Sequence, residues 1–160
     1  MESESGTPVT SSIKTGDFLI RASLQQYAYK VDELNSEMPF QLEVYLEYNG
    51  PEEQAEIWHG HFMYNVMMLD ASRVPVVLTG NPDELGSTIL EKGKPYSDIW
   101  TGRGEYKAVN GFVPGAYTLV VEFNFYTYTA DGEKHLIYVF LKFHLSFQNK
   151  NITTRELIKI

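Results

Sequence analysis

The sequence predicts an all-β protein, and three observations support this. Apolar and polar side chains alternate with a period of two residues through two long segments that flank a turn near residue 131. Shorter alternating segments recur along the chain, separated by Gly, Pro and Asn. No segment shows the 3.6-residue period of an amphipathic helix.

The longest alternating region runs from Pro114 to Phe147 and predicts a β-hairpin. Asp131 and Gly132 lie between its arms, and both residue types tolerate the positive φ of tight hairpin turns. The apolar residues of each arm fall on one face, which we expect to join the core. These are Tyr117, Leu119, Val121, Phe123 and Phe125 in the first arm, and Ile137, Val139, Leu141, Phe143, Leu145 and Phe147 in the second.

Shorter segments with the same character predict the remaining strands. We expect them at 17–24, 40–48, 56–69, 74–78, 96–100 and 152–160. The segment 25–38 is ambiguous, because alternation at 27–31 is consistent with a continued first strand before an acidic turn. The segment 56–69 is expected to be interrupted near Gly60, and 79–87 to form a loop. The segment 74–78 contains Pro75, which cannot donate to a ladder, so we expect it at a sheet edge. Short strands joined by such turns favour a β-sandwich or barrel.

Size and composition suit a single domain with a polar leader. The chain has 160 residues, of which 14% are aromatic, and aromatic side chains bury large areas. We expect a flexible leader over 1–15, because a polar tract gains too little burial to offset its ordering entropy. Residues 16–160 are expected to form one β-sandwich domain. Trp58, Trp100 and the methionines at 63, 67 and 68 are expected in its core.

The charge and the absence of cysteine exclude several classes of function. The net charge is −8 and basic residues form no cluster, which argues against a nucleic-acid-binding surface. No cysteine is present, so disulfides, thiolate nucleophiles and thiolate metal sites are excluded. No apolar run approaches the roughly 20 residues of a transmembrane helix.

The polar leader suggests where the protein is found. A tract of this kind follows the lipid-bearing cysteine of bacterial lipoproteins, so a removed export signal would place the domain outside the cell or anchored to a membrane. Without such a signal the protein would be cytoplasmic. The start of the full-length gene distinguishes these two localisations.

Two segments together resemble a known family. One is the turn at 92–95 followed by Tyr96-Ser97-Asp98-Ile99-Trp100, and the other is Val113-Pro114-Gly115-Ala116-Tyr117-Thr118-Leu119. With the strand order of 40–69, they resemble the immunoglobulin-like antiparallel β-sandwich of the bacterial intracellular proteinase inhibitor (BsuPI) family. The resemblance covers about 38–125 and implies binding to a subtilisin-like protease without catalysis. The leader and the strand after Asp131 depart from that family, and no inhibitory loop can be aligned.

The sequence contains no catalytic arrangement, and its candidate metal ligands are few. His59 and His61 lie two residues apart, on the same side of an extended segment, and Glu56 is a candidate third ligand. A zinc site needs three or four ligands, so we predict no metal or other cofactor and keep a metal-binding protein as an alternative. No serine lies in a nucleophile motif with a histidine and a carboxylate, so we predict a protein that is not an enzyme.

The outer face of the hairpin carries the candidate binding residues. Tyr126, Tyr128, Tyr138 and Phe140 share the face opposite the core. If this face is open to water, it is an apolar patch of the kind that marks interaction sites. If another segment covers it, the same residues are core. We predict a non-catalytic domain that binds another protein through these residues, and a carbohydrate-binding module using the three tyrosines is the alternative.

Overall fold

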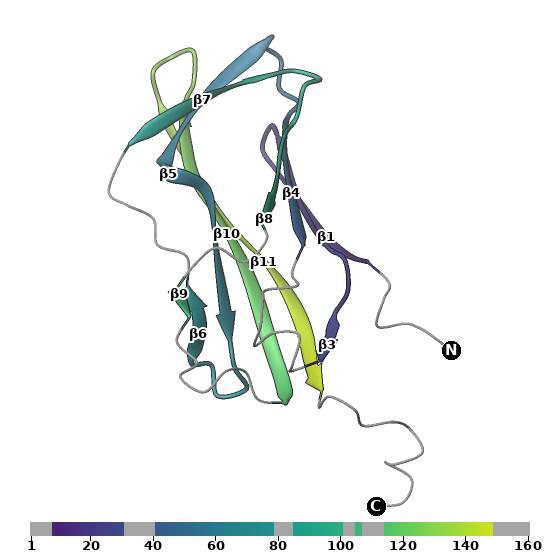
Figure 1. Cartoon of the computed structure of the whole chain (residues 1–160). Coiled ribbons are helices and arrows are strands. Elements are labelled where there is room, and N and C mark those ends of the chain that lie inside the picture. The colour runs from purple at the N-terminus through teal and green to yellow at the C-terminus, as the bar shows by residue number, and fades with distance from the viewer. Residues whose placement is uncertain (1–7, 31–40, 79–84, 101–104, 107–113, 149–160) are drawn as a thin grey trace, which may run out of the picture.

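The computed structural model describes residues 8–30, 41–78, 85–100, 105–106 and 114–148. The described chain is all-β and folds into two packed sheets, as Figure 1 shows. The predicted β-sandwich is therefore confirmed. Pairing is antiparallel throughout the described ladders except between β3 and β11, which run parallel. The more specific assignment to the immunoglobulin-like class stays a prediction.

The smaller sheet has four strands among the described residues. They are β1 (Val9–Thr15), β2 (Phe18–Leu24), β4 (Leu42–Tyr48) and β8 (Tyr96–Trp100), in the order β1-β2-β4-β8. Leu42, Val44, Leu46 and Tyr48 are buried along β4, whereas Glu43 on its other face is exposed. This is the alternation that the sequence predicts for a strand with one face on the core.

The larger sheet has seven strands among the described residues. They are β3 (Ala28–Lys30), β5 (Gln54–Leu69), β6 (Pro75–Leu78), β7 (Gly86–Glu91), β9 (Glu105–Tyr106), β10 (Gly115–Tyr128) and β11 (Lys134–Gln148). Their order is β3-β11-β10-β5-β6-β9, and β7 pairs with the first half of β5. The four turns β1–β2, β4–β5, β7–β8 and β10–β11 gather at the upper end in Figure 1.

The long hairpin forms as the sequence predicts. β10 and β11 pair over 14 residues, from Gly115 opposite Phe147 to Tyr128 opposite Lys134. Gly132 has a φ of 83° in the turn, where a side chain would be strained. The predicted core face is buried except at Val139, which is half-buried. A period-two pattern assigns these faces without reference to the rest of the chain.

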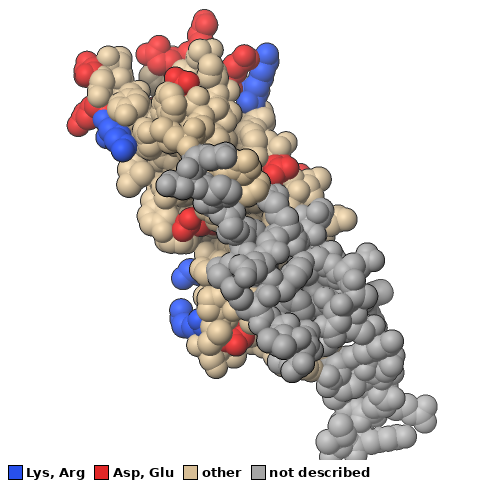
Figure 2. Space-filling model, turned by 60° about the vertical axis from the view of Figure 1, so that its left-hand side comes forward, with Lys and Arg blue, Asp and Glu red and all other residues tan. Residues whose placement is uncertain are grey.

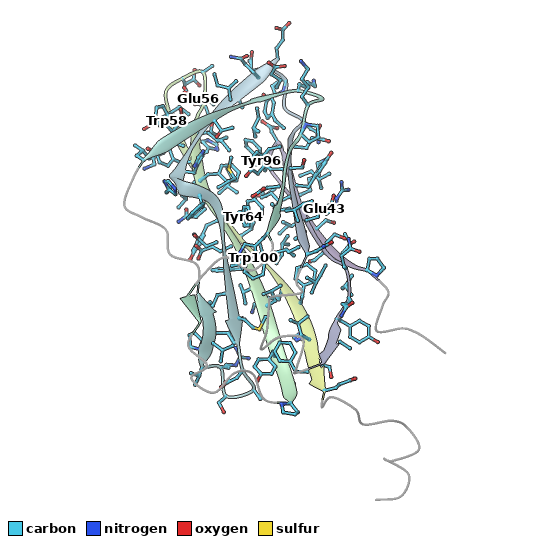
Figure 3. All side chains as sticks on the ribbon, in the orientation of Figure 1. Glu43, Glu56, Trp58, Tyr64, Tyr96 and Trp100 are labelled. Carbon is cyan, nitrogen blue, oxygen red and sulfur yellow. The ribbon has the colours of Figure 1, made fainter. Side chains whose placement is uncertain are left out.

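One continuous core lies between the sheets. Trp100 on β8 and Tyr64 on β5 are almost completely buried, and Figure 3 shows both between the layers, with Glu43 on the outside. The Tyr64 hydroxyl donates a hydrogen bond to Asp98 Oδ2 over 2.8 Å, which links the two sheets. Met63 and Met68 are buried as predicted, and Met67 is half-buried on the outer face.

Two predictions about strand positions are wrong. Residues 9–15, predicted as part of a flexible leader, form β1 and pair with β2 from Val9 opposite Leu24 to Thr15 opposite Phe18. A polar strand is stable at this edge because the ladder uses backbone groups and leaves most of its side chains in water. The segment predicted at a sheet edge is β6, which lies between β5 and β9.

Other predictions need a smaller adjustment. β5 is a single strand of 16 residues, and its predicted interruption near Gly60 is a shift in register with β10. β7 includes Gly86 and Ser87, which we predicted as the end of a loop. The predicted strand at 152–160 and the leader residues 1–7 lie outside the described residues. Within the described part of the chain, no helix has the length and apolar character needed to cross a membrane.

Candidate functional site

Large apolar side chains are exposed on the outer face of the hairpin. Tyr128 is 52% exposed, Tyr138 51% and Phe140 45%, and Leu136 beside them is 64% exposed. Tyr126, opposite Leu136 in the ladder, is half-buried. All four predicted binding residues therefore lie on one face of the sheet. The described residues leave three of them largely open to water.

The strand register adds Trp58 to the same face. Trp58 on β5 lies opposite Tyr126 on β10, which lies opposite Leu136 on β11, so the three form a row across the sheet. We predicted Trp58 in the core, but its neighbour Ile57 takes the buried side and Trp58 is half-buried on the outer one. We call this surface the hairpin face. Its members are Trp58, Tyr126, Tyr128, Leu136, Tyr138 and Phe140.

Contacts within the hairpin face orient its rings. The centroids of Tyr126 and Tyr128 lie 5.7 Å apart with an interplanar angle of 86°, and those of Tyr138 and Phe140 lie 4.9 Å apart at 56°. Edge-to-face and tilted pairs at such distances are favourable for aromatic rings. Lys134 Nζ stands 4.1 Å from the centre of the Tyr126 ring, a cation–π geometry. These contacts present the rings in defined positions.

A carboxylate anchors one side of the hairpin face. Tyr138 donates its hydroxyl to Glu122 Oε2 over 3.0 Å, and Asn65 Nδ2 donates to Glu122 Oε1 over 3.3 Å. The hydrogen bond to the Glu122 carboxylate is the main cause that raises the pKa of Tyr138, because it favours the protonated phenol. Desolvation and the negative charge of Glu122 act in the same direction.

Replacing Glu122 by glutamine is expected to lower the pKa of Tyr138 toward the ordinary tyrosine value. Because the pKa of Tyr138 is raised in the folded protein, this contact stabilises the fold below pH about 10. The stabilisation is lost as the pH rises through the pKa of Tyr138 in the folded state. An NMR titration of tyrosine ring carbons in the wild type and in Glu122→Gln measures the shift. Tyr45 is the internal control, because it lies on the smaller sheet and its pKa is raised mainly by a hydrogen bond to Glu47 on the same strand. An unchanged Tyr138 titration contradicts this assignment.

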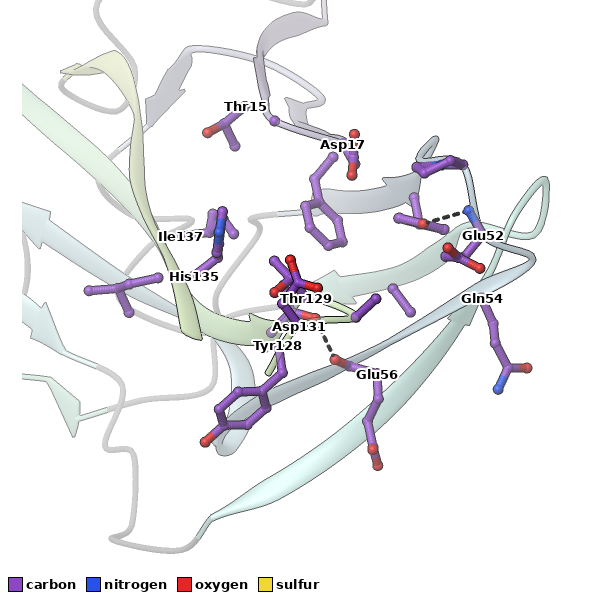
Figure 4. A pocket seen from close by; sticks show the side chains of 18 residues that line it. Thr15, Asp17, Glu52, Gln54, Glu56, Tyr128, Thr129, Asp131, His135 and Ile137 are labelled. Carbon is purple, nitrogen blue, oxygen red and sulfur yellow. Dashed lines mark hydrogen bonds between the residues drawn. The ribbon is translucent and has the colours of Figure 1, made fainter. Parts of the chain in front are cut away.

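A cavity opens at the end of the sandwich, beside the turn of the hairpin (Figure 4). Its volume is 770 Å³, and it lies among residues of the β1–β2, β4–β5 and β10–β11 connections. Phe18, Tyr48 and Ile137, all buried, form its apolar part. The Phe18 and Tyr48 rings pack at 5.6 Å, and the Glu52 backbone N–H donates to the Tyr48 hydroxyl over 3.1 Å. We call this space the tip cavity.

The lining of the tip cavity is acidic. Asp17, Glu52, Glu56 and Asp131 line it, and no Lys or Arg among the described residues does. The Glu56 carboxylate is turned away in Figure 4 and accepts a hydrogen bond from the Ser87 hydroxyl over 3.0 Å. Acidic side chains also gather over this end of the molecule in Figure 2. Sequence reasoning missed the cavity, because its walls come from segments more than 100 residues apart.

The two candidate metal ligands meet in a separate pocket. His59 and His61 line a space of 290 Å³ together with Tyr64, Tyr96 and Asp98. His59 Nδ1 lies 2.7 Å from the Gly60 carbonyl, and its Nε2 lies 2.7 Å from Thr88 Oγ1. The carbonyl can only accept, so Nδ1 carries a proton, and Nε2 shares a hydrogen bond with the threonine hydroxyl. Both His59 nitrogens are therefore engaged within the protein.

The candidate third ligand does not join the histidines. Glu56 lies three residues before His59 on a strand, so its side chain points to the opposite face. Within the described ranges, no group of three or more His, Cys, Asp or Glu side chains is arranged to hold a metal ion. The alternative of a metal site at His59 and His61 thus lacks structural support in this part of the chain.

Comparison with protein-family models gave no match, and comparison with curated proteins gave no significant match. The resemblance to the BsuPI family therefore stays a prediction from the sequence. The function must be inferred from the surfaces of the domain itself.

Proposed function

We propose that this domain binds another protein, without catalysing a reaction, and that the hairpin face is the contact surface. One observation carries the proposal: Tyr128, Leu136, Tyr138 and Phe140 expose large apolar areas side by side on rigid, paired strands. Single exposed apolar residues are ordinary, whereas a contiguous group of them tends to mark an interaction site.

The composition of the hairpin face favours a protein over a carbohydrate. Tyr and Trp are enriched at the centres of protein interfaces, where the ring is buried and the polar end keeps a hydrogen bond. Leu136 and Ile89, which lies on the outer face of the adjoining β7, are both more than half exposed. Branched aliphatic side chains supply apolar area for a protein partner but no flat ring for stacking on a sugar.

The arrangement of the rings supports tight binding. The Glu122 hydrogen bond and the Lys134 contact hold Tyr138 and Tyr126 before a partner arrives. Less side-chain entropy is then lost on association, and this entropy is one of the main costs of binding. A subtilisin-like protease is the partner that the BsuPI resemblance implies. Export is the localisation suggested by the polar residues 1–7, which precede β1 in the sequence.

A double variant in the hairpin face tests the proposal. We expect Tyr138→Ser/Phe140→Ser to lose the partner that the wild-type domain captures from an extract of the source cells. One interface anchor of this type contributes about 2 kcal/mol or more, so the loss of even one of the two should lower the affinity for the purified partner by at least about thirtyfold. Ile99→Ser is the matched control, since Ile99 is exposed on the outer face of the other sheet.

Two outcomes would contradict this function. The first is a double variant that folds like the wild type and keeps its affinity for the partner. The second is a glycan array on which the wild type binds sugars through the same tyrosines. A panel of subtilisin-like proteases tests the inhibitor version separately, because a domain that leaves them all active can still bind another protein.

A further inference from the structure

We propose that the tip cavity receives a basic segment of the protein partner, with a lysine or arginine side chain held by its acidic rim. This inference rests on the proposed function, because it names the chemistry of one part of the partner. The hairpin face and the tip cavity adjoin, since Tyr128 and Leu136 contribute to both. A partner that covers Tyr128 and Leu136 therefore lies next to the cavity.

The size of the cavity fits a segment of chain. Its 770 Å³ lies within the range of about 300–1,000 Å³ typical of ligand pockets. The buried side chains of Phe18, Tyr48 and Ile137 supply an apolar wall. The methylene stem of a lysine or arginine packs on such a wall while its charged end stays at the polar rim.

The charge of the rim selects a cation. Asp17, Glu52 and Asp131 are exposed carboxylate residues. The ion pairs found among the described residues, Lys94 with Glu91 and His135 with Glu133, engage none of the three. The imidazole of His135 also lines the cavity, and its Nε2 lies 3.9 Å from a carboxylate oxygen of Glu133. An anionic ligand would meet uncompensated like charge here, whereas a guanidinium or ammonium group would gain charge-assisted hydrogen bonds.

The strands beneath the cavity keep the rim in place. The Asn49 backbone N–H donates to the Asp17 carbonyl over 2.7 Å, joining the β1–β2 and β4–β5 turns. The Thr127 hydroxyl donates to the Glu56 carbonyl over 2.9 Å, joining β10 to β5. In the hairpin turn, the Gly132 N–H donates to the Thr129 carbonyl over 2.9 Å. The carboxylates are thus carried on connected turns, which suits a preformed site.

Short capped peptides provide the probe. We expect the full chain, labelled with ¹⁵N, to bind acetyl-Gly-Leu-Arg-Leu-Gly-amide, with amide shifts at Asp17, Glu52 and Asp131. The peptide with glutamate in place of arginine should bind at least about tenfold more weakly, because a charge-assisted contact contributes more than about 1.4 kcal/mol. The variant Asp17→Asn/Asp131→Asn should weaken the arginine peptide to the same extent. Glu43→Gln, exposed on the outer face of β4, should leave it unchanged.

The outcomes separate this inference from the proposed function. Any one of three results overturns the basic segment. They are equal binding of the arginine and glutamate peptides, no amide shifts at the cavity, and unchanged binding of the arginine peptide by Asp17→Asn/Asp131→Asn. Capture of a partner that depends on Tyr138 and Phe140 but not on Asp17 and Asp131 overturns it as well, while leaving the hairpin face in place. Arginine-peptide binding that survives Tyr138→Ser/Phe140→Ser supports the cavity even if no partner is captured.

Discussion

Trp100→Ala is expected to lower the free energy of unfolding by about 3–5 kcal/mol, the range observed for large aromatic side chains removed from a core. Trp100 is 0% exposed and lies on β8, facing the larger sheet. Its removal loses the transfer free energy of the indole and leaves a space that fixed strands cannot close. Urea unfolding followed by circular dichroism measures the change.

The adjacent residue is the control for Trp100. Ile99 is 57% exposed and points away from the core, so Ile99→Ala should change stability by no more than about 0.5 kcal/mol. The two substitutions affect neighbouring positions of one strand and differ mainly in the face they alter. Similar effects on stability would show that Trp100 is not part of the packed core.

Gly50→Ala is expected to destabilise the domain by about 1–3 kcal/mol through overpacking. A Cβ at position 50 would overlap the ring of Tyr48, which is 4% exposed. The ring cannot move freely, because it packs on Phe18 and its hydroxyl accepts a hydrogen bond from the Glu52 backbone. Thermal or urea unfolding measures the loss.

Asn49→Ala provides the comparison for Gly50→Ala. Asn49 is exposed in the same turn, and its contact with Asp17 uses only its backbone N–H, which alanine retains. We expect an effect within about 0.5 kcal/mol. If Gly50→Ala proved as mild as Asn49→Ala, the Tyr48 ring would have room to move, and the wall of the tip cavity would be less rigid than its contacts indicate.

Local alternation explains why much of the fold can be predicted. The faces of the hairpin, and the buried positions of β2 and β4, follow from a period of two that each segment carries by itself. The turn at Gly132 follows from residue chemistry in the same way. β1 was not predicted, because it forms a strand by pairing its backbone with β2 and carries no alternating pattern of its own. Of its side chains, only Val9 packs against the core cluster.

The sequence by itself determined that this chain forms strands, and which side of the long hairpin holds Tyr126, Tyr128, Tyr138 and Phe140. Only the tertiary structure decided that this side is open over the described residues, that Trp58 joins it, and that Asp17, Glu52 and Asp131 surround one cavity. The physical reason is the separation along the sequence of the residues that set each property. Alternation is a property of neighbouring residues, whereas exposure, register and cavities depend on how segments distant in the sequence pack together.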